Sequence, residues 1–476
     1  MVKSPYRVMS ACGGLGSGMI KPWLRTVMSA RTNVLVVDGS AAQFADHATM
    51  SDDLRAVIEA GVATDGPVII GNCGASGANR DVDALLAVAR TVFGELDVSD
   101  MKVAVIRSEV SAEVLIDAMR ASALHPFDSQ PGEDEVALRD STFVGQMGVH
   151  PIFTALASGA KFVFAARACG ASLFAADMIR HGIPSGLAYH AGQILSNAAF
   201  VDEAGLCEGL SAEILEDGKA VFRAQHSTQP FTAYSLAAHS QSGWSHPHLH
   251  PFPEGVLASG RTEYFAVDTH TAGLSSSVFY HSDEAGASGI KLEGARRGAS
   301  TVPDEGTVRH VLQNGRTVCE ALFPIEHFDV KGDEWRRIGR SQAAYFELGE
   351  LAADEDLDEK TRSVIEDAPP RAASHDVHRL SDITRAIRCV SAGPHRLTID
   401  IFFASEDQYE MALRSNLFCA RRLAKALDIQ RSSLVGTYFI DSCSAIKLTL
   451  ERQAVQSLDP PLQSRVERLV VPVHAS

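Results

Sequence analysis

The chain has 476 residues, of which 45% are hydrophobic and 21% charged, a composition typical of a globular protein with two or three domains. Its formal net charge of -16 argues against a general nucleic-acid or acidic-membrane binder, because like charges repel. The eight cysteines are scattered without a C-x-x-C pair, and no apolar run is long enough to span a bilayer. We therefore expect a cytoplasmic protein with reduced thiols and no nucleic-acid or membrane partner.

The first 210 residues alternate between short apolar runs and helical patterns. The apolar runs lack polar alternation, which is typical of strands buried on both faces, and they predict an α/β fold with an open, mostly parallel sheet. The expected strands are Tyr6–Cys12, Asn33–Asp38, Pro67–Cys73, Met101–Ser108 and Lys161–Cys169. The expected helices between them are Met19–Ala30, Asp52–Ala60 and Asp81–Phe93.

The alternation of apolar runs and helical patterns ends after this region, and we expect three further segments. Residues 211–345 are a strand-rich continuation of the main domain, and residues 346–376 form an acidic helix and linker. Residues 377–476 predict a smaller α+β module. Its expected elements are strands at Arg396–Phe403, Leu434–Ile440 and Ala445–Leu450, with a helix at Tyr409–Ala426.

The glycine-rich stretch SACGGLGSGM (Ser10–Met19) is the first candidate site, since it joins a predicted strand to a predicted helix. Backbone N–H groups at such a turn can approach a substrate anion, and the helix N-terminus adds favourable partial charge. The candidate substrate-binding residues are Gly13, Gly14, Gly16, Ser17 and Gly18, with Asp38 at the end of the next strand. The spacing matches neither the dinucleotide fingerprint nor a P-loop, so no cofactor is expected. The alternative is a close-packed turn without a ligand.

Polar side chains at the ends of the predicted strands form the second candidate site, because ligands gather at the carboxyl edge of open α/β sheets. Asn72 and Asn79 can polarise a carbonyl, Cys73 is a candidate nucleophile, and Arg167 can hold a carboxylate or phosphate. The alternatives are a small buried hydrophobic side chain for each thiol and a structural salt bridge for Arg167.

Histidines and charged residues further along the chain supply the remaining candidates. His239 is a candidate acid or base, because imidazole titrates near neutral pH, and Glu293 is a second candidate base. Lys447 of the C-terminal module is a candidate substrate-binding residue. In HPHLH, alternation in an extended segment would place three imidazoles on one face, the pattern of a zinc site that Glu254 can complete. Three prolines in and just after this stretch (Pro247, Pro251 and Pro253) favour a surface loop instead, and we assign no metal.

Several motifs, taken in order along the chain, resemble the AtuA family of acyclic terpene utilisation proteins. After the glycine loop they are NCGASGAN (Asn72–Asn79), FVFAARACGASLF (Phe162–Phe174), P-x-T-x-x-S-x-A-A-H (Pro230–His239), EGVL (Glu254–Leu257) and KLEGAR (Lys291–Arg296). The C-terminal module is similar to a small domain of unknown function that is often encoded beside AtuA-like proteins, through Ile387–Phe403 and Ala445–Arg452.

The resemblance implies a catabolic enzyme that acts on a small carboxylic acid or coenzyme A thioester by proton transfer, as a hydratase, lyase or isomerase. The sequence departs from the family pattern at Met19 and Gly170, where an aspartate is expected. Two alternatives therefore stay open: a metal-dependent hydrolase that uses His246, His248 and His250, and a non-catalytic scaffold with a decayed site. We expect a homo-oligomer.

Overall fold

A computed structural model describes most of the chain, and all structural statements concern these residues. The described residues are 5–16, 32–39, 47–74, 76–126, 134–197, 209–225, 230–281, 289–296, 308–313, 322–342, 377–393, 395–455 and 461–472. The expected helix at Met19–Ala30 and the expected acidic helix in residues 346–376 lie outside them. In the described part, no helix is long and apolar enough to cross a membrane.

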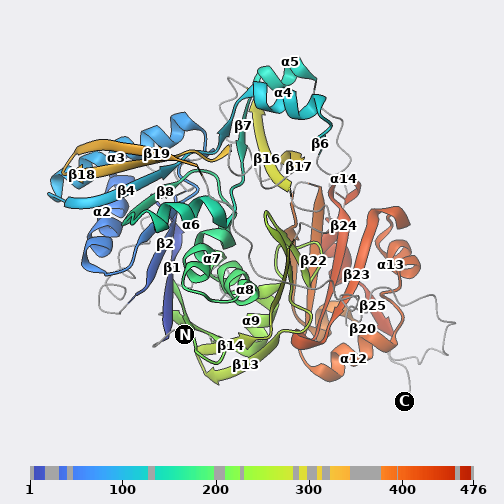
Figure 1. The fold of residues 1–476 in the computed structure, drawn as a ribbon. Coiled ribbons are helices and arrows are strands. Elements are labelled where there is room, and N and C mark those ends of the chain that lie inside the picture. Colours follow the sequence, from blue (N-terminus) through green and yellow to red (C-terminus); the bar gives the residue numbers. More distant parts are fainter. Residues whose placement is uncertain are drawn as a thin grey trace. The chain divides into compact units, whose positions relative to one another are not determined.

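The chain forms two compact units (Figure 1). The first unit contains Met1–Leu236 and Pro251–Ala352. The second unit contains Ala353–Ser476 and also Ala237–His250, a segment that lies more than a hundred positions earlier in the sequence.

The main sheet of the first unit has eleven strands among the described residues, in the order β13-β14-β10-β9-β1-β2-β3-β8-β4-β18-β19. Its central strands are parallel, namely β1 (Tyr6–Gly14), β2 (Val34–Asp38), β3 (Val68–Gly71), β8 (Phe162–Ala165) and β4 (Ser99–Ile106). Residues on both faces of β2, β3 and β8 are almost completely buried, as the non-alternating apolar runs predict. The predicted α/β class is therefore confirmed.

The outer strands of this sheet are antiparallel, which the sequence did not predict. On one side β9 (Gly209–Ile214) pairs with β1, and on the other β18 (Ile325–Lys331) pairs with β4. The remaining outer strands are β10 (Ala220–Gln225), β13 (Glu263–Asp268), β14 (Thr271–Ser275) and β19 (Glu334–Ser341). Short connections join the antiparallel pairs β9–β10, β13–β14 and β18–β19, whereas β1–β9 and β4–β18 pair strands that are far apart in the sequence.

Helices cover the parallel strands and position the polar side chains at their carboxyl ends. The helices of this part are α2 (His47–Ala63), α3 (Asn79–Glu95), α6 (Val149–Ala157), α7 (Gly170–Arg180) and α8 (Ser185–Ser196), with α4 (Ala112–Arg120) and α5 (Glu135–Arg139) further out. A five-stranded sheet runs β5 (Glu109–Val110), β7 (Ser141–Gly145), β16 (Gly289–Arg296), β17 (Val308–Gln313) and β6 (Leu124–Pro126) in the described residues. A smaller sheet contains β11 (Leu249–Phe252), β12 (Gly255–Ala258) and β15 (Val278–His281).

The second unit is built around an antiparallel sheet in the order β21-β22-β24-β23. Its strands are β21 (Thr384–Ser391), β22 (Arg396–Phe403), β23 (Leu434–Ile440) and β24 (Ala445–Glu451), with β20 (Val377–Arg379) paired to β25 (Val470–Pro472). Its helices are α9 (Ala233–Ser240, which begins in the first unit), α11 (Leu380–Ile383), α12 (Glu406–Arg414), α13 (Ala420–Leu427), α14 (Arg452–Val455) and α15 (Leu462–Glu467), with short 3-10 turns at η4 (Arg431–Ser433) and η5 (Asp441–Cys443). The three predicted strands are confirmed.

The single helix expected at Tyr409–Ala426 is two helices, α12 and α13. Asn416, between them, has a positive φ of 53°, a left-handed conformation that ends a right-handed helix. Apolar side chains from both helices still reach one shared core, which explains the continuous helical pattern in the sequence.

Candidate active site

The glycine loop holds a carboxylate of its own chain. Gly16 has a left-handed φ of 86°, and its N–H donates to Oδ2 of Asp53 at 2.9 Å. Asp53 is fully buried in α2. The Gly16 amide that was expected to bind a substrate anion is therefore already occupied. Asp38 is exposed at the end of β2, Gly13 and Gly14 lie in β1, and Ser17 and Gly18 lie outside the described residues.

Asn72 and Cys73, expected to be catalytic, have structural roles at the end of β3. Asn72 has a left-handed φ of 51°, and its Oδ1 accepts a hydrogen bond from the backbone N–H of Ala168 at 3.0 Å. Cys73 is fully buried, and its thiol donates to the carbonyl of Ile70 at 3.1 Å. Burial, assisted by the nearby Asp38, raises the pKa of the Cys73 thiol, so it stays protonated and is a poor nucleophile.

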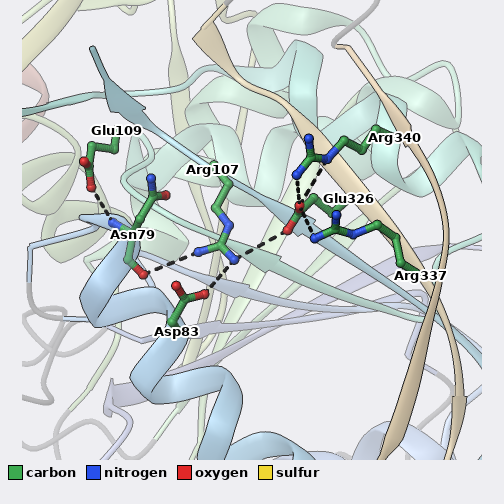
Figure 2. A network of polar contacts seen from close by, with 7 residues as sticks. All are labelled: Asn79, Asp83, Arg107, Glu109, Glu326, Arg337 and Arg340. Atoms are coloured by element: carbon green, nitrogen blue, oxygen red, sulfur yellow. Dashed lines mark hydrogen bonds and ion pairs between the residues drawn. The ribbon is translucent and has the colours of Figure 1, made fainter. Parts of the chain in front are cut away.

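Asn79, expected to bind substrate, begins α3 and belongs to a charged network (Figure 2). Its N–H donates to Oε2 of Glu109 at 2.7 Å, and its carbonyl accepts from Arg107. Figure 2 shows the Glu326 carboxylate between the guanidinium groups of Arg107, Arg337 and Arg340. Burial alone would raise the pKa of Glu326, but these cations outweigh it and lower that pKa. The network ties β18 and β19 to β4, which is a structural role.

Arg167 and Glu293 form an ion pair, which brings two predicted site residues together. Nε of Arg167 lies 2.9 Å from Oε2 of Glu293. The Arg167 side chain is 25% exposed and Glu293 only 10%, so the pair is partly shielded from water. The Arg167 backbone is fixed, because its N–H donates to Oγ of Ser108 at 3.0 Å. Gly77 allows the backbone of its loop to lie close to Arg167, since a Cβ at Gly77 would lie 2.8 Å from the Arg167 Cβ.

Glu254 is the centre of a buried polar group that sequence reasoning considered only as a metal ligand. Its Oε1 accepts from the N–H of Val149 at 2.6 Å, and its Oε2 accepts from the Tyr189 hydroxyl. Nδ1 of His150 lies 3.4 Å from the same Oε1. All these side chains are almost fully buried. The carboxylate sits at the N-terminus of α6, where the backbone dipole stabilises negative charge.

Cys169 and Lys291 connect Glu254 electrostatically to the ion pair. Burial lowers the pKa of Lys291, while Cys169 and Glu293 oppose that effect. Burial also raises the pKa of Cys169, and Glu254 adds to that shift while Lys291 opposes it. Burial, followed by the adjacent Glu254, raises the pKa of Tyr189 well above its usual range. The pKa of each of these side chains therefore depends on the charge of its neighbour in the cluster.

We use the name Glu254 cluster for His150, Cys169, Tyr189, Glu254 and Lys291, with the Arg167–Glu293 pair beside it. The cluster draws on the β8–α7 junction, the start of α6, α8, the turn between β11 and β12, and β16. It thus lies at the carboxyl side of the parallel strands, where open α/β sheets bind ligands. One feature of the sequence could have predicted this cluster. It is the presence of polar residues within otherwise apolar helical stretches, such as Tyr189 in SGLAYHAGQILS.

His239 and Lys447 belong to the second unit, whereas the Glu254 cluster belongs to the first. His239 is 4% exposed near the end of α9. Lys447 is fully buried, and its Nζ lies 2.5 Å from Oδ1 of Asp400 on the neighbouring strand β22. The structure therefore gives Lys447 a core ion pair in place of the expected substrate contact.

The histidines of HPHLH do not form the expected extended face. Pro247 interrupts the alternation, and Nδ1 of His246 accepts from the N–H groups of His248 and Leu249 at 3.1 and 3.0 Å. The His250 ring stacks on Trp244 with centroids 4.8 Å apart. Among the described residues, no three histidine, cysteine or acidic side chains are arranged to hold a metal ion. The geometry thus gives no support to the metal-hydrolase alternative.

The buried imidazole of His248 is expected to make the stability of the second unit sensitive to acid. Burial, then the neighbouring His246, lowers the pKa of His248 from 6.5 to about 4, against a smaller opposing effect of Asp441. The unfolded chain therefore binds a proton more readily, and stability falls as the pH drops from 6.5 towards 4, by up to about 3 kcal/mol. Urea unfolding at several pH values should show a flatter dependence for His248→Gln than for the wild type. The exposed His378 supplies the control variant His378→Gln, and equal slopes in all three proteins would contradict this assignment.

Comparison with protein families gives two matches. Residues 29–182 match the acyclic terpene utilisation family protein AtuA, and residues 380–458 match a domain of unknown function (DUF4387). The first match includes Arg167 and Cys169, and the second includes all four strands of the β21-β22-β24-β23 sheet. Neither the curated proteins nor the solved structures gave a match. The resemblance noted from the sequence is confirmed: residues 29–182 are similar to the AtuA family and residues 380–458 to DUF4387.

Proposed function

We propose that the first unit is a metabolic enzyme that acts on a small carboxylic acid or acyl-CoA thioester by proton transfer, as a hydratase, lyase or isomerase. The observation that supports this most is the Glu254 cluster, in which buried Glu254 contacts Tyr189 and His150, and the Cys169 thiol and the Lys291 amine lie close enough to affect each other's pKa. Buried ionisable groups with shifted pKa values are typical of sites that move protons.

Arg167 is the group that we assign to the substrate anion. It is the more exposed member of its ion pair, and a guanidinium can bind a carboxylate or phosphate through two parallel hydrogen bonds. Glu293 keeps the free guanidinium oriented and neutralised before substrate arrives. This role agrees with the position of Arg167 directly after the parallel strand β8.

Lys291 is the group that we assign to proton transfer, with Tyr189 and Glu254 beside it. Burial lowers the pKa of Lys291, and we assign its amine to take up the proton from a carbon beside a carbonyl. The Tyr189 hydroxyl donates its one hydrogen to Glu254, so in this scheme it positions that carboxylate and does not contact the substrate. Cys169 stays a neutral thiol in this scheme.

The proposed substrate class rests on the resemblance to the AtuA family. That resemblance implies branched or unsaturated carboxylic acids and their coenzyme A thioesters, whose α-hydrogens and double bonds are suited to hydration and isomerisation. The description of the matching family as acyclic terpene utilisation therefore supports substrates of this kind.

Arg167→Gln should weaken binding of a branched unsaturated acid or its thioester about tenfold to a hundredfold, because a charge-assisted hydrogen bond is lost. Titration calorimetry measures the binding, and proton NMR in D₂O measures exchange of substrate α-hydrogens. Arg223→Gln is the matched control, since Arg223 pairs with Asp268 at the surface at 3.4 Å. Equal affinities for all three proteins, or ligand binding without α-hydrogen exchange in the wild type, would contradict the proposal.

A further inference from the structure

The second unit is completed by a segment from the middle of the chain. We call Ala237–His250 the docking segment, and residues 377–472 the C-terminal module. The docking segment lies outside both family matches, which cover residues 29–182 and 380–458. It nevertheless belongs to the same compact unit as the module.

Specific polar contacts hold the docking segment on the module. Nε2 of Gln241 donates to the Cys443 thiol at 2.9 Å, and the Thr449 hydroxyl donates to the Ser245 carbonyl at 2.6 Å. Gln241, Cys443 and Thr449 are each at most 2% exposed. The contacted side chains of the module come from η5 and β24, which are neighbours along the chain.

Ring and charge contacts extend this surface. The His246 ring lies edge-on to Tyr438 of β23, with centroids 4.8 Å apart. His248 is close enough to Asp441 of η5 for that carboxylate to affect its pKa. The module thus recognises the segment through a thiol, a hydroxyl and an aromatic ring, a set of contacts that depends on the sequence of the segment.

The docking segment precedes residues 353–376, which connect the module covalently to the rest of the chain. These contacts therefore do not require that connection. The chain passes between the units after Leu236, after His250 and after Ala352. A cut within residues 353–376 removes only the last of these connections. The module would then be held by non-covalent contacts alone.

We infer that the surface of β23, η5 and β24 is a docking site for the Ala237–His250 segment, tight enough to retain the C-terminal module without a covalent link. The module is therefore the equivalent of a bound subunit, and its partner is the histidine-rich docking segment. This inference is independent of the proposed catalytic function.

Controlled proteolysis of the full-length protein tests the inference. A protease recognition sequence is introduced between residues 353 and 376, the folded protein is cut to completion, and the products are separated by size exclusion at about 1 μM. Fragments held with a Kd below roughly 1 μM elute together, and native mass spectrometry should give a 1:1 complex. Separation of the wild-type fragments under these conditions would overturn the inference.

A matched pair of variants assigns the retention to the docking segment. The double variant Gln241→Leu/Thr449→Val removes both polar contacts and should weaken retention about tenfold or more for each bond. Thr398→Val is the control, because Thr398 is equally buried but donates to Val390 within the module. Circular dichroism of the uncut variants checks that each one folds. Retention that is equally tight in the double variant and in the control would also overturn the inference.

Discussion

Lys447→Met is expected to lower the free energy of unfolding by about 3–5 kcal/mol, since it leaves a buried carboxylate without its counter-charge. Lys447 and Asp400 are directly opposite each other on β24 and β22, with Nζ and Oδ1 2.5 Å apart. Both side chains are at most 1% exposed, so water cannot solvate the remaining charge. Urea unfolding followed by circular dichroism measures the loss.

The double variant Lys447→Met/Asp400→Leu is the control for this prediction. Replacing both members of a buried pair with apolar side chains of similar size is often neutral or stabilising, so the double variant should recover most of the lost stability. A Lys447→Met protein as stable as the wild type, with weakened ligand binding, would contradict the structural role. It would instead favour the substrate-binding role expected from the sequence.

The central strands could be predicted from the sequence because burial on both faces leaves a local signal. Val34–Val37 and Val68–Ile70 are continuous apolar runs, and helical patterns separate them from the next apolar runs along the chain. The antiparallel edges left no such signal, since β1 pairs with β9 across about two hundred residues. Which distant strand joins an edge depends on tertiary packing, which a local pattern does not encode.

The candidate site was predicted only in part, for the same reason. Arg167 and Glu293 were each expected, but their pairing joins positions 126 residues apart. Glu254 was expected only as a metal ligand. Its hydrogen-bond partners Val149 and Tyr189 lie in two helices far from it in the sequence, so a local pattern could not reveal them. The Gly16 amide was assigned to a substrate, and only the structure shows that buried Asp53 accepts from it.

Gly148→Ala is expected to displace Glu254 and lower the free energy of unfolding by about 3 kcal/mol or more. Gly148 precedes α6, and an added Cβ would lie 1.5 Å from Oε1 of Glu254. The backbone of Gly148 has a negative φ of -93°, so the alanine itself fits the local conformation and the clash with the carboxylate is the cause. Displacement breaks the hydrogen bonds of Glu254 to Val149 and Tyr189.

A double-mutant cycle isolates this clash. In Glu254→Ala the carboxylate is already absent, so adding Gly148→Ala should have a much smaller effect than it has in the wild type. Gly339→Ala is the matched control, because a Cβ at Gly339 meets no atom within 4 Å. Urea unfolding of these variants gives the coupling energy, and additive effects would show that Gly148 and Glu254 do not interact. If the proposed function holds, Gly148→Ala also loses α-hydrogen exchange, since the clash moves the carboxylate that holds Tyr189 in place.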